Sequence, residues 1–479
     1  MSENSKYDAI VIGSGPNGLA AAITLARAGL SVLVQEAVET IGGGTRTREL
    51  TLPGYLHDVC SAIHPLGLAS PFFKDLPLGK YGLEWVHPSA PLAHPLDGGR
   101  AILLETSIDA TAAQLGRDAD AYRRLLKPYA NKLDHLTEDL LGPLPLPPRH
   151  LSEVVSFGLQ AIRSGKGFAR STFRDESARA LFAGMAAHSI LPLDQPITAS
   201  FGLVMLIMGH QGGWPLARGG SQKITQAMAD YFCSLGGEIR TGHRVTSLDE
   251  LPPSRAIFFD TSPREVLKIA GDRLPARYRR QLEGYRYGAG VCKVDFALDG
   301  PIPWENPEVA RAGTVHVGGM LEEIVASEAA VGRGEHVERP FVLLAQQSLF
   351  DPSRAPEGKH TVWAYCHVPN GSKVDMTPRI EAQIERFAPG FKKRIQARYT
   401  RLASDWEKYN PNYVGGDINT GAQDLWQFFT RPVWRLTPYR MPVKGLYLCS
   451  SATPPGGGVH GMCGYHAAKT ALKDLRVIR

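Results

Sequence analysis

The motif Gly-Ser-Gly-Pro-Asn-Gly at residues 13–18 is the feature that most constrains how this chain can fold. A short apolar strand, YDAIVI, precedes the motif, and a helical run to residue 28 follows it. Gly29 then ends the helix, and a second strand, SVLVQE, leads to Glu36. Strand, glycine turn, helix and strand in this order predict a parallel βαβ unit of the Rossmann type.

The three glycines of this motif have distinct roles in binding a dinucleotide. Gly13 permits the tight turn, Gly15 lets the backbone approach a pyrophosphate, and Gly18 lets the helix pack closely on the strand. The helix N-terminus favours the negative charge of the pyrophosphate. Glu36 ends the second strand, where it would accept a hydrogen bond from a ribose hydroxyl. The unit predicts a dinucleotide site and leaves NAD and FAD open.

Two further glycine loops favour FAD. GGGTRT follows Glu36 at residues 42–47, and SSATPPGGGVHG occupies residues 450–461, directly before a helix. An extended cofactor needs close backbone approaches at several points along its length. The sequence has no second GxGxxG inside a βαβ unit, so we expect no separate NAD(P)H domain.

Composition and charge exclude several classes of protein. The chain has 479 residues, of which 43% are hydrophobic and 21% charged, as in ordinary globular proteins. The net charge of +6 is too small for a dedicated nucleic-acid binder, although it permits a weak peripheral contact with an anionic membrane. The six cysteines form no CxxC pair, so neither a zinc site nor a redox dithiol is expected, and we expect no metal.

The sequence also bears on location. The start, MSENSKYDA, lacks the basic and apolar pattern of a signal peptide, and no apolar stretch reaches the ~20 residues that a spanning helix needs. We therefore expect a cytoplasmic protein.

The chain resembles, over nearly its whole length, the phytoene desaturase-like branch of the FAD-dependent amine oxidase and desaturase superfamily. The motifs that carry the resemblance are GSGPNGLAAAITLARAGLSVLVQEA with GGGTRT, then RGGSQKITQAMADYFCSLGGEI with RVTSL, and finally PPGGGVHGMCG. The resemblance implies a flavoprotein that transfers hydride at flavin N5. It also implies lipid or isoprenoid substrates, and an electron acceptor that stays unidentified.

The resemblance further implies which residues contact FAD. They are Gly13, Gly15, Pro16, Asn17 and Gly18 at the pyrophosphate, Glu36 at the adenosine ribose, Gly43, Gly44, Thr45 and Arg46 along the cofactor, Val245 at the adenine, and Gly457, Gly458 and Val459 at the flavin ring. The sequence departs from many relatives in one place, because Ser450 and Ser451 stand where an acid contacts the ribitol chain. It also lacks the hairpin that relatives carry after Val245.

Two residues are candidates for catalysis. Lys293, in GAGVCKVDFAL, resembles the lysine that holds a water against flavin N5 in amine oxidases. The alternative is a solvent-facing lysine on a half-covered strand. His460, inside the last glycine loop, could relay a proton as a neutral imidazole. The alternative is a histidine that only hydrogen-bonds the start of the next helix.

The predicted fold is α/β, with a Rossmann-type FAD-binding domain and a second, α+β substrate domain. The FAD domain is assembled from residues 1–75, 215–275 and 435–479, and the substrate domain from residues 76–214 and 276–434. The apolar run Ala199 to Met208 is predicted either to line a tunnel for an apolar substrate or to be a core helix; Leu203 and Leu206 would distinguish the two.

The predicted function is oxidoreduction of C–C bonds in an apolar isoprenoid or lipid-like molecule, by desaturation, saturation or isomerisation. One alternative is a flavin amine oxidase acting on a C–N bond. Another is a non-catalytic binding module on the same scaffold. The oligomeric state stays open.

Overall fold

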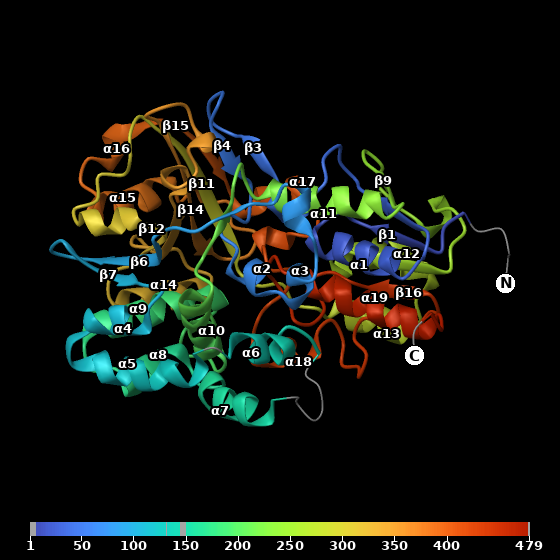
Figure 1. The fold of residues 1–479 in the computed structure, drawn as a ribbon, viewed down its shortest axis with the longest axis horizontal. Coiled ribbons are helices and arrows are strands. Elements are labelled where there is room, and N and C mark those ends of the chain that lie inside the picture. Colours follow the sequence, from blue (N-terminus) through green and yellow to red (C-terminus); the bar gives the residue numbers. More distant parts are fainter. Residues whose placement is uncertain (1–5, 131, 144–149, 478–479) are drawn as a thin grey trace.

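The computed structural model describes residues 6–130, 132–143 and 150–477. Two sheets lie at opposite ends of an elongated molecule, and the segments between them cross from one end to the other (Figure 1). The segment GPLPLPP at residues 142–148 predicts a loop or hinge, because proline cannot continue a helix, and only residues 142 and 143 of it are described.

The first sheet has five parallel strands in the order β16-β10-β1-β2-β9. Their bounds are Leu446–Leu448 (β16), Ala256–Phe259 (β10), Ala9–Ile12 (β1), Val32–Gln35 (β2) and Glu238–Arg240 (β9). The strands come from three distant parts of the chain, and all lie within the three segments assigned to the FAD domain from the sequence. The Rossmann-type α/β fold class is thereby confirmed.

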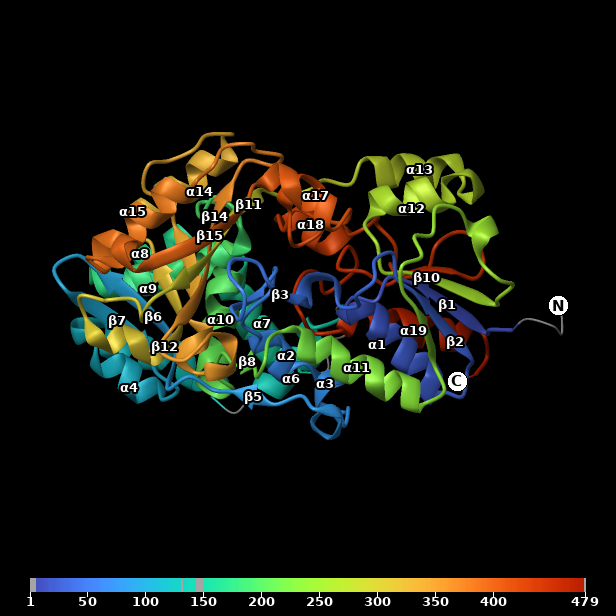
Figure 2. The ribbon, with the colours of Figure 1, turned by 90° about the horizontal axis from the view of Figure 1, so that it is seen from above.

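Helices cover both faces of this sheet (Figure 2). Alternation along β1 directs Ala9 and Val11 to one face and Ile12 to the other. The first face packs against α1 (Pro16–Arg27), α11 (Gln222–Ser234) and α19 (Met462–Asp474), and the second against α12 (Pro263–Ala270) and α13 (Ala276–Glu283). Helix α13 was assigned from the sequence to the substrate domain. In the structure its Tyr278 and Leu282 pack with Phe259 of β10, so α13 accompanies the first sheet.

The second sheet has seven mixed strands in the order β15-β11-β14-β13-β12-β6-β7. Their bounds are Ile395–Arg401 (β15), Gly290–Leu298 (β11), His360–Val368 (β14), Val342–Ala345 (β13), Ala312–Val317 (β12), Ala90–Leu96 (β6) and Arg100–Leu104 (β7). One face, with Val342 and Leu344 of β13, packs against α15 (Thr377–Phe387) and α16 (Phe391–Arg394). The other face, with Leu343 and Ala345, faces a layer of helices.

That helical layer comes mostly from residues 108–211. It contains α4 (Ile108–Ala113), α5 (Ala119–Leu126), α6 (Leu133–Leu140), α7 (Leu151–Ala161), α8 (Gly165–Thr172), α9 (Glu176–Ala186) and α10 (Thr198–Gln211), with α14 (Leu321–Gly332) beside them. The sequence predicts one helical region over residues 109–141, which the structure divides into three helices. Gly116, with φ of +51°, and Pro128 interrupt it, because neither residue favours a continuous helix.

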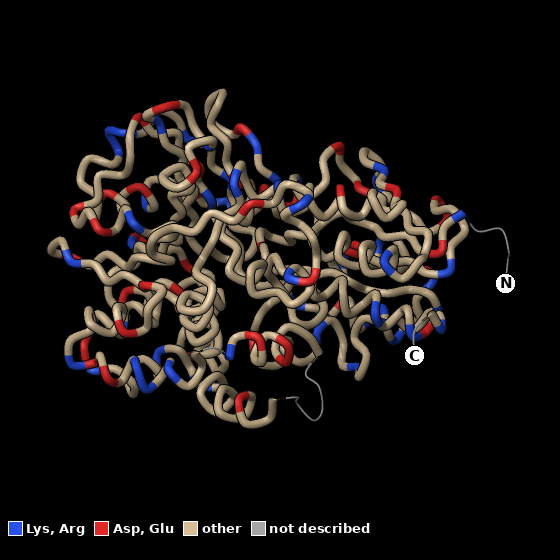
Figure 3. Tube along the Cα trace, viewed as in Figure 1, with Lys and Arg blue, Asp and Glu red and all other residues tan. Residues whose placement is uncertain are grey.

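Short elements connect the two ends of the molecule. They are β3 (Thr47–Glu49), β4 (Leu56–Asp58), α2 (Pro65–Ala69), α3 (Pro71–Lys74), β5 (Trp85–Val86), β8 (Leu216–Ala217), α17 (Trp406–Tyr409) and α18 (Leu425–Thr430). Positive and negative side chains alternate along the outside, whereas α10, near the centre of the molecule, carries none (Figure 3). No helix in the described part of the chain is long and apolar enough to cross a membrane.

Candidate functional site

A cavity of about 1420 Å³ runs between the two sheets. Its wall includes all three glycine loops at one end and residues of α6, α7, α10 and the second sheet at the other. The motifs that lie hundreds of residues apart in the sequence therefore line one continuous space.

The first glycine loop is packed so closely that it excludes side chains. A Cβ atom on Gly18 would lie 2.1 Å from the carbonyl oxygen of Gly13, and Gly13 itself has φ of +105°. Pro16 and Asn17 begin α1, and both line the cavity with Gly13 and Gly15. The backbone at the start of α1 is thus open to a bound pyrophosphate, as the sequence predicts.

Glu36 lies at the end of β2 and is buried in the same wall. Its Oε2 accepts hydrogen bonds from the Ser14 amide at 3.1 Å and the Ser14 hydroxyl at 2.5 Å. Its Oε1 pairs with Arg46 Nη2 at 3.2 Å. These contacts fix the carboxylate beside the glycine loop, where a ribose would reach it.

The second glycine loop touches the first. The Gly42 amide donates to the carbonyl of Ser14 at 3.1 Å, and a Cβ on Gly43 would lie 3.2 Å from Gly15 Cα. Gly43, Gly44, Thr45 and Arg46 all line the cavity, as does Val245.

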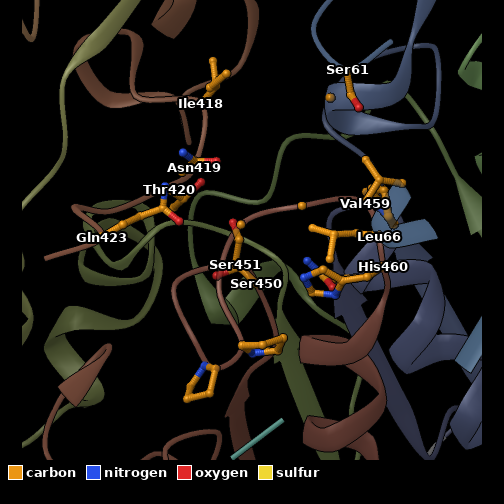
Figure 4. A pocket seen from close by; sticks show the side chains of 18 of the residues that line it. Ser61, Leu66, Ile418, Asn419, Thr420, Gln423, Ser450, Ser451, Val459 and His460 are labelled. Atoms are coloured by element: carbon orange, nitrogen blue, oxygen red, sulfur yellow. The ribbon is translucent and has the colours of Figure 1, made fainter. Parts of the chain in front are cut away.

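The third glycine loop also lines the cavity (Figure 4). Gly457, Gly458 and Val459 line it, together with Ser450 and Ser451. Ser61, Leu66, Ile418 and Asn419 surround this loop, and none of these four side chains is aromatic (Figure 4).

Buried polar atoms along the first end of the cavity indicate that a polar group belongs there. Asn17 Oδ1, Gln35 Oε1 and Thr261 Oγ1 line the cavity and have no hydrogen-bond partner among the described residues. A buried polar atom without a partner costs roughly 1–3 kcal/mol. A phosphate and ribose chain would supply partners, so the residues present fit a dinucleotide cofactor.

The model of the flavin containing amine oxidoreductase family matches residues 17–469. The chain belongs to this family. It is 28% identical to pyridine nucleotide-disulfide oxidoreductase domain-containing protein 2 of Rattus norvegicus, with 98% of this chain and 94% of the relative covered. It is 24% identical to the lycopene-forming phytoene desaturase of a Paracoccus species, with 98% and 97% covered.

Solved structures agree on the fold of this flavoprotein family. An oxidoreductase from Methanosarcina mazei superposes with a TM-score of 0.66 at 17% identity, covering 97% of this chain and 99% of that one. Wild-type putrescine oxidase bound to putrescine superposes with a TM-score of 0.62 at 17% identity, covering 98% and 99%. The chain is an FAD-dependent oxidoreductase, and the FAD predicted from the glycine loops is its cofactor.

Lys293 of this flavoprotein is not at the surface. Its side chain is buried on β11, and its Nζ pairs with Asp295 and lies 5.8 Å from the Trp363 ring. Burial lowers the pKa of Lys293 and raises that of Asp295 to about 6. Lys293 lies behind Cys60 and Trp363, which line the cavity, and does not itself line it. The solvent-facing alternative is therefore wrong, and a role beside the flavin stays a prediction.

His460 lines the cavity with both ring nitrogens engaged by backbone groups. Nδ1 accepts from the Met462 amide at 3.0 Å, so Nε2 carries the proton that is donated to the Gly456 carbonyl at 3.2 Å. Burial lowers its pKa to about 4, which keeps the ring neutral. These contacts hold the glycine loop at the start of α19, and proton relay stays a prediction.

Sequence reasoning missed Asp260. This residue follows β10, lines the cavity, and accepts a hydrogen bond from the Gly18 amide at 2.9 Å. Its position at the site could have been predicted from the strand that precedes it, because the carboxyl ends of parallel strands meet at the ligand-binding edge of a Rossmann sheet.

Helix α10 contains the apolar run Ala199 to Met208, which the sequence predicts to be either a tunnel wall or a core helix. Leu203 and Leu206 are fully buried in the core, whereas Phe201, Val204 and Met205 line the cavity. The helix is therefore both core and cavity wall, and the two leucines lie on its core side.

Proposed function

We propose that this flavoprotein transfers hydride to or from a carbon of an apolar, isoprenoid or lipid-like substrate, and so desaturates, saturates or isomerises C–C bonds. The observation that carries the proposal is the chemistry of the far half of the cavity. None of the lining residues contributed by α6, α7, α10, β12, β13 and β14 is charged. The members of that wall are mostly aliphatic or aromatic: Leu133, Leu136, Leu140, Val154, Val155, Phe157, Leu159, Phe201, Val204, Met205, Met208, Leu343 and Trp363.

Such a wall favours an apolar ligand, because burying apolar area yields roughly 25 cal/mol per Å². It gives a charged ammonium no carboxylate partner in that half of the cavity. It also excludes water from the reacting carbons, which protects them from competing hydration. When bound, FAD accepts or returns a hydride at N5 of its ring.

The outer end of the apolar wall supports the same substrate class. Leu159 of α7 is 72% exposed and Trp434 is 76% exposed, yet both also line the cavity. Leu436, which lines it too, is fully exposed. We call Leu159, Trp434 and Leu436 the apolar rim. A rim of this kind suits transfer of substrate from a lipid surface, through the weak peripheral membrane contact that the net charge permits.

The family's amine oxidase members favour a second candidate, oxidation of a C–N bond. An aromatic pair at the flavin would support it. Trp363, Tyr365, Tyr409 and Tyr413 line the same cavity, so the experiment below decides between the two candidates. The intact glycine loops argue against a non-catalytic module.

The test is anaerobic reduction or oxidation of the bound flavin by a panel of polyenes, fatty acyl compounds and small amines, followed by absorbance. We expect a response to polyenes or acyl compounds. A response to a small hydrophilic amine, with none to any lipid, would establish the amine oxidase instead.

A further inference from the structure

One row of residues across the second sheet contains two members of the cavity wall, Leu343 and Tyr365. On adjacent strands, His316 of β12 is paired with Leu343 of β13, Leu343 with Tyr365 of β14, and Tyr365 with Lys293 of β11. Adjacent strands lie about 4.8 Å apart, so His316 lies about 10 Å from Tyr365 and about 14 Å from Lys293. His316 is therefore well separated from the buried Lys293–Asp295 pair.

His316 belongs to a cluster of three histidines, of which His94 and His316 are buried and His188 is partly exposed. Its Nε2 lies 2.9 Å from Nε2 of His188, and its ring centroid lies 6.3 Å from that of His94. Trp214 packs edge-on against His188 and His316 at 5.5 and 6.0 Å. A Cβ on Gly184 of α9 would lie 2.6 Å from His316 Nδ1, so only glycine leaves room for the cluster.

The cluster is uncharged at neutral pH. Burial lowers the pKa of His188 to about 3 and that of His94 to about 4, and it lowers the pKa of His316 well below its ordinary value. The described residues include no group of three or more potential ligands placed to hold a metal ion. The imidazoles are thus available only as neutral donors and acceptors.

The hydrogen bonds indicate where the protons sit. The Nε2–Nε2 contact needs one proton, on either His188 or His316. If His188 supplied it, the proton of neutral His316 would be on Nδ1, which is buried without a partner in the described structure. A buried N–H without an acceptor is rarer than an acceptor without a donor. We therefore assign the shared proton to His316, which leaves Nδ1–H of His188 as a donor.

His188 lines the cavity, and its Nδ1 has no acceptor among the residues described. Two hydroxyls on the cavity face of the sheet also lack a hydrogen-bond partner among the described residues. Thr314 is 3% exposed and its Oγ1 has no partner. Tyr365 also lines the cavity, and none of its described contacts is a hydrogen bond. Three hydrogen-bonding groups thus meet an otherwise apolar space without partners.

Backbone strain also concentrates at this cavity. Ile190, two residues after His188, has φ of +54°, and Ile197, at the start of α10, has φ of +72°. A β-branched residue in this region is an outlier that the surrounding structure must stabilise, and such residues gather at ligand sites. Both isoleucines line the cavity.

We propose that His188, Thr314 and Tyr365 form a polar subsite in which at least one of these groups hydrogen-bonds an uncharged oxygen, a carbonyl or hydroxyl, of an otherwise apolar substrate. The inference rests on the proposed function and narrows its substrate class from hydrocarbons to oxygen-bearing isoprenoids or lipids. The subsite offers no charge to a carboxylate or an ammonium group. A neutral group at that place would satisfy partners that a hydrocarbon leaves unsatisfied.

The experiment compares five ligands with one carbon skeleton: farnesene, farnesol, farnesal, farnesoic acid and farnesylamine. Their dissociation constants for the holoprotein are measured from the change in flavin absorbance or tryptophan fluorescence, so no turnover is required. We expect farnesol or farnesal to bind about fivefold to tenfold more tightly than farnesene, the acid and the amine, as one or two neutral hydrogen bonds would give.

Variants assign that preference to the subsite. In His188→Phe and in Thr314→Val, the oxygenated ligands should fall to within about twofold of farnesene, while farnesene itself binds as before. His188→Gln, which keeps a donor, should retain part of the preference. Thr361→Val is the matched control, because Thr361 also has a buried hydroxyl without a partner but does not line the cavity. FAD content and melting temperature confirm folding, and the isosteric Thr314→Val keeps the test open if His188→Phe does not fold.

Two outcomes overturn the proposal in distinguishable ways. If farnesene binds as tightly as farnesol and farnesal, the subsite proposal is wrong and the proposed function still stands. The same holds if the preference for farnesol and farnesal survives both His188→Phe and Thr314→Val. If farnesylamine binds most tightly, or none of the five ligands binds, the proposed function is wrong and the subsite proposal, which rests on it, is wrong too.

Discussion

The carboxylate of Asp260 accepts a hydrogen bond of 2.9 Å from the backbone amide of Gly18. A Cβ on Gly15 would lie 2.7 Å from the same carboxylate oxygen, so Asp260 lies directly under the turn that receives the pyrophosphate. Its removal from water raises its pKa to about 7, with Glu36 contributing in the same direction. An acid with a raised pKa is protonated in the folded state while the unfolded chain has already ionised. The contribution of Asp260 to the free energy of unfolding is therefore largest below about pH 4 and is lost as pH rises towards 7.

The first prediction concerns the pH dependence of FAD binding. As pH rises from 6 to 8, Asp260 ionises beside the pyrophosphate, and the dissociation constant of FAD should increase about tenfold. Asp260→Asn keeps an acceptor for Gly18 and should make FAD affinity independent of pH over this range. Fluorescence titration of the apo-protein with FAD measures the dissociation constant at each pH. Asp272→Asn, at an exposed aspartate, is the control. A wild-type protein whose FAD affinity is the same at pH 6 and 8 would contradict it.

Lys293→Met should destabilise the protein by about 3 kcal/mol, since it leaves Asp295 buried without its cation. Combining it with Asp295→Leu should recover most of the loss, because apolar residues of similar volume often replace a buried ion pair at no cost. Chemical denaturation measures both. A role beside the flavin predicts, in addition, a slower flavin half-reaction or slower reoxidation in the double variant; unchanged rates in both would leave Lys293 a structural residue.

The two sides of α10 predict opposite phenotypes. Leu203→Ala removes a fully buried side chain and should cost about 2–5 kcal/mol with little change in ligand affinity. Met205→Trp projects extra volume into the cavity, and it should weaken binding of an apolar ligand while the melting temperature stays near that of wild type. Calorimetry and ligand titration on the same samples separate the effects. If Met205→Trp binds apolar ligands normally, the substrate lies elsewhere.

The apolar rim should attach the protein weakly to lipid. Co-sedimentation with vesicles of phosphatidylcholine and phosphatidylglycerol should fall at least severalfold in Leu159→Asp combined with Trp434→Asp, because each buried apolar side chain contributes roughly 1.5–3 kcal/mol. Val374→Asp, at an exposed valine outside the cavity wall, is the control and should sediment like wild type. Wild-type protein that stays in the supernatant at every lipid concentration would refute this prediction.

NADH and NADPH should be poor reductants of the bound flavin, because the sequence holds one dinucleotide fingerprint and the FAD occupies it. Anaerobic stopped-flow mixing gives the rate of bleaching. Rapid bleaching that saturates with either nucleotide would reveal a second nucleotide site.

The first glycine turn and its βαβ unit were predictable because their determinants are local in sequence. Gly13, Gly15 and Gly18 specify their own turn, and Glu36 is positioned by the strand that follows. The histidine cluster was not predictable, since His94, His188 and His316 come from three separate elements and meet only through the register of β6 with β12 and the packing of α9. Lys293 falls between these cases. The alternation of apolar residues correctly predicted its strand, but only the tertiary structure shows that Asp295 is its partner.

The parallel pairing of β16 with β10 has a consequence during synthesis. Ile257 of β10 pairs with Leu446 of β16, and the loop that reaches the flavin end of the cavity follows β16 directly. A nascent chain can form β1, α1 and β2 early and hold the adenosine half of the cofactor weakly. The wall at the flavin end is completed only when residues 446–474 have left the ribosome, so stable cofactor loading must wait for the synthesis of this last segment of the sheet.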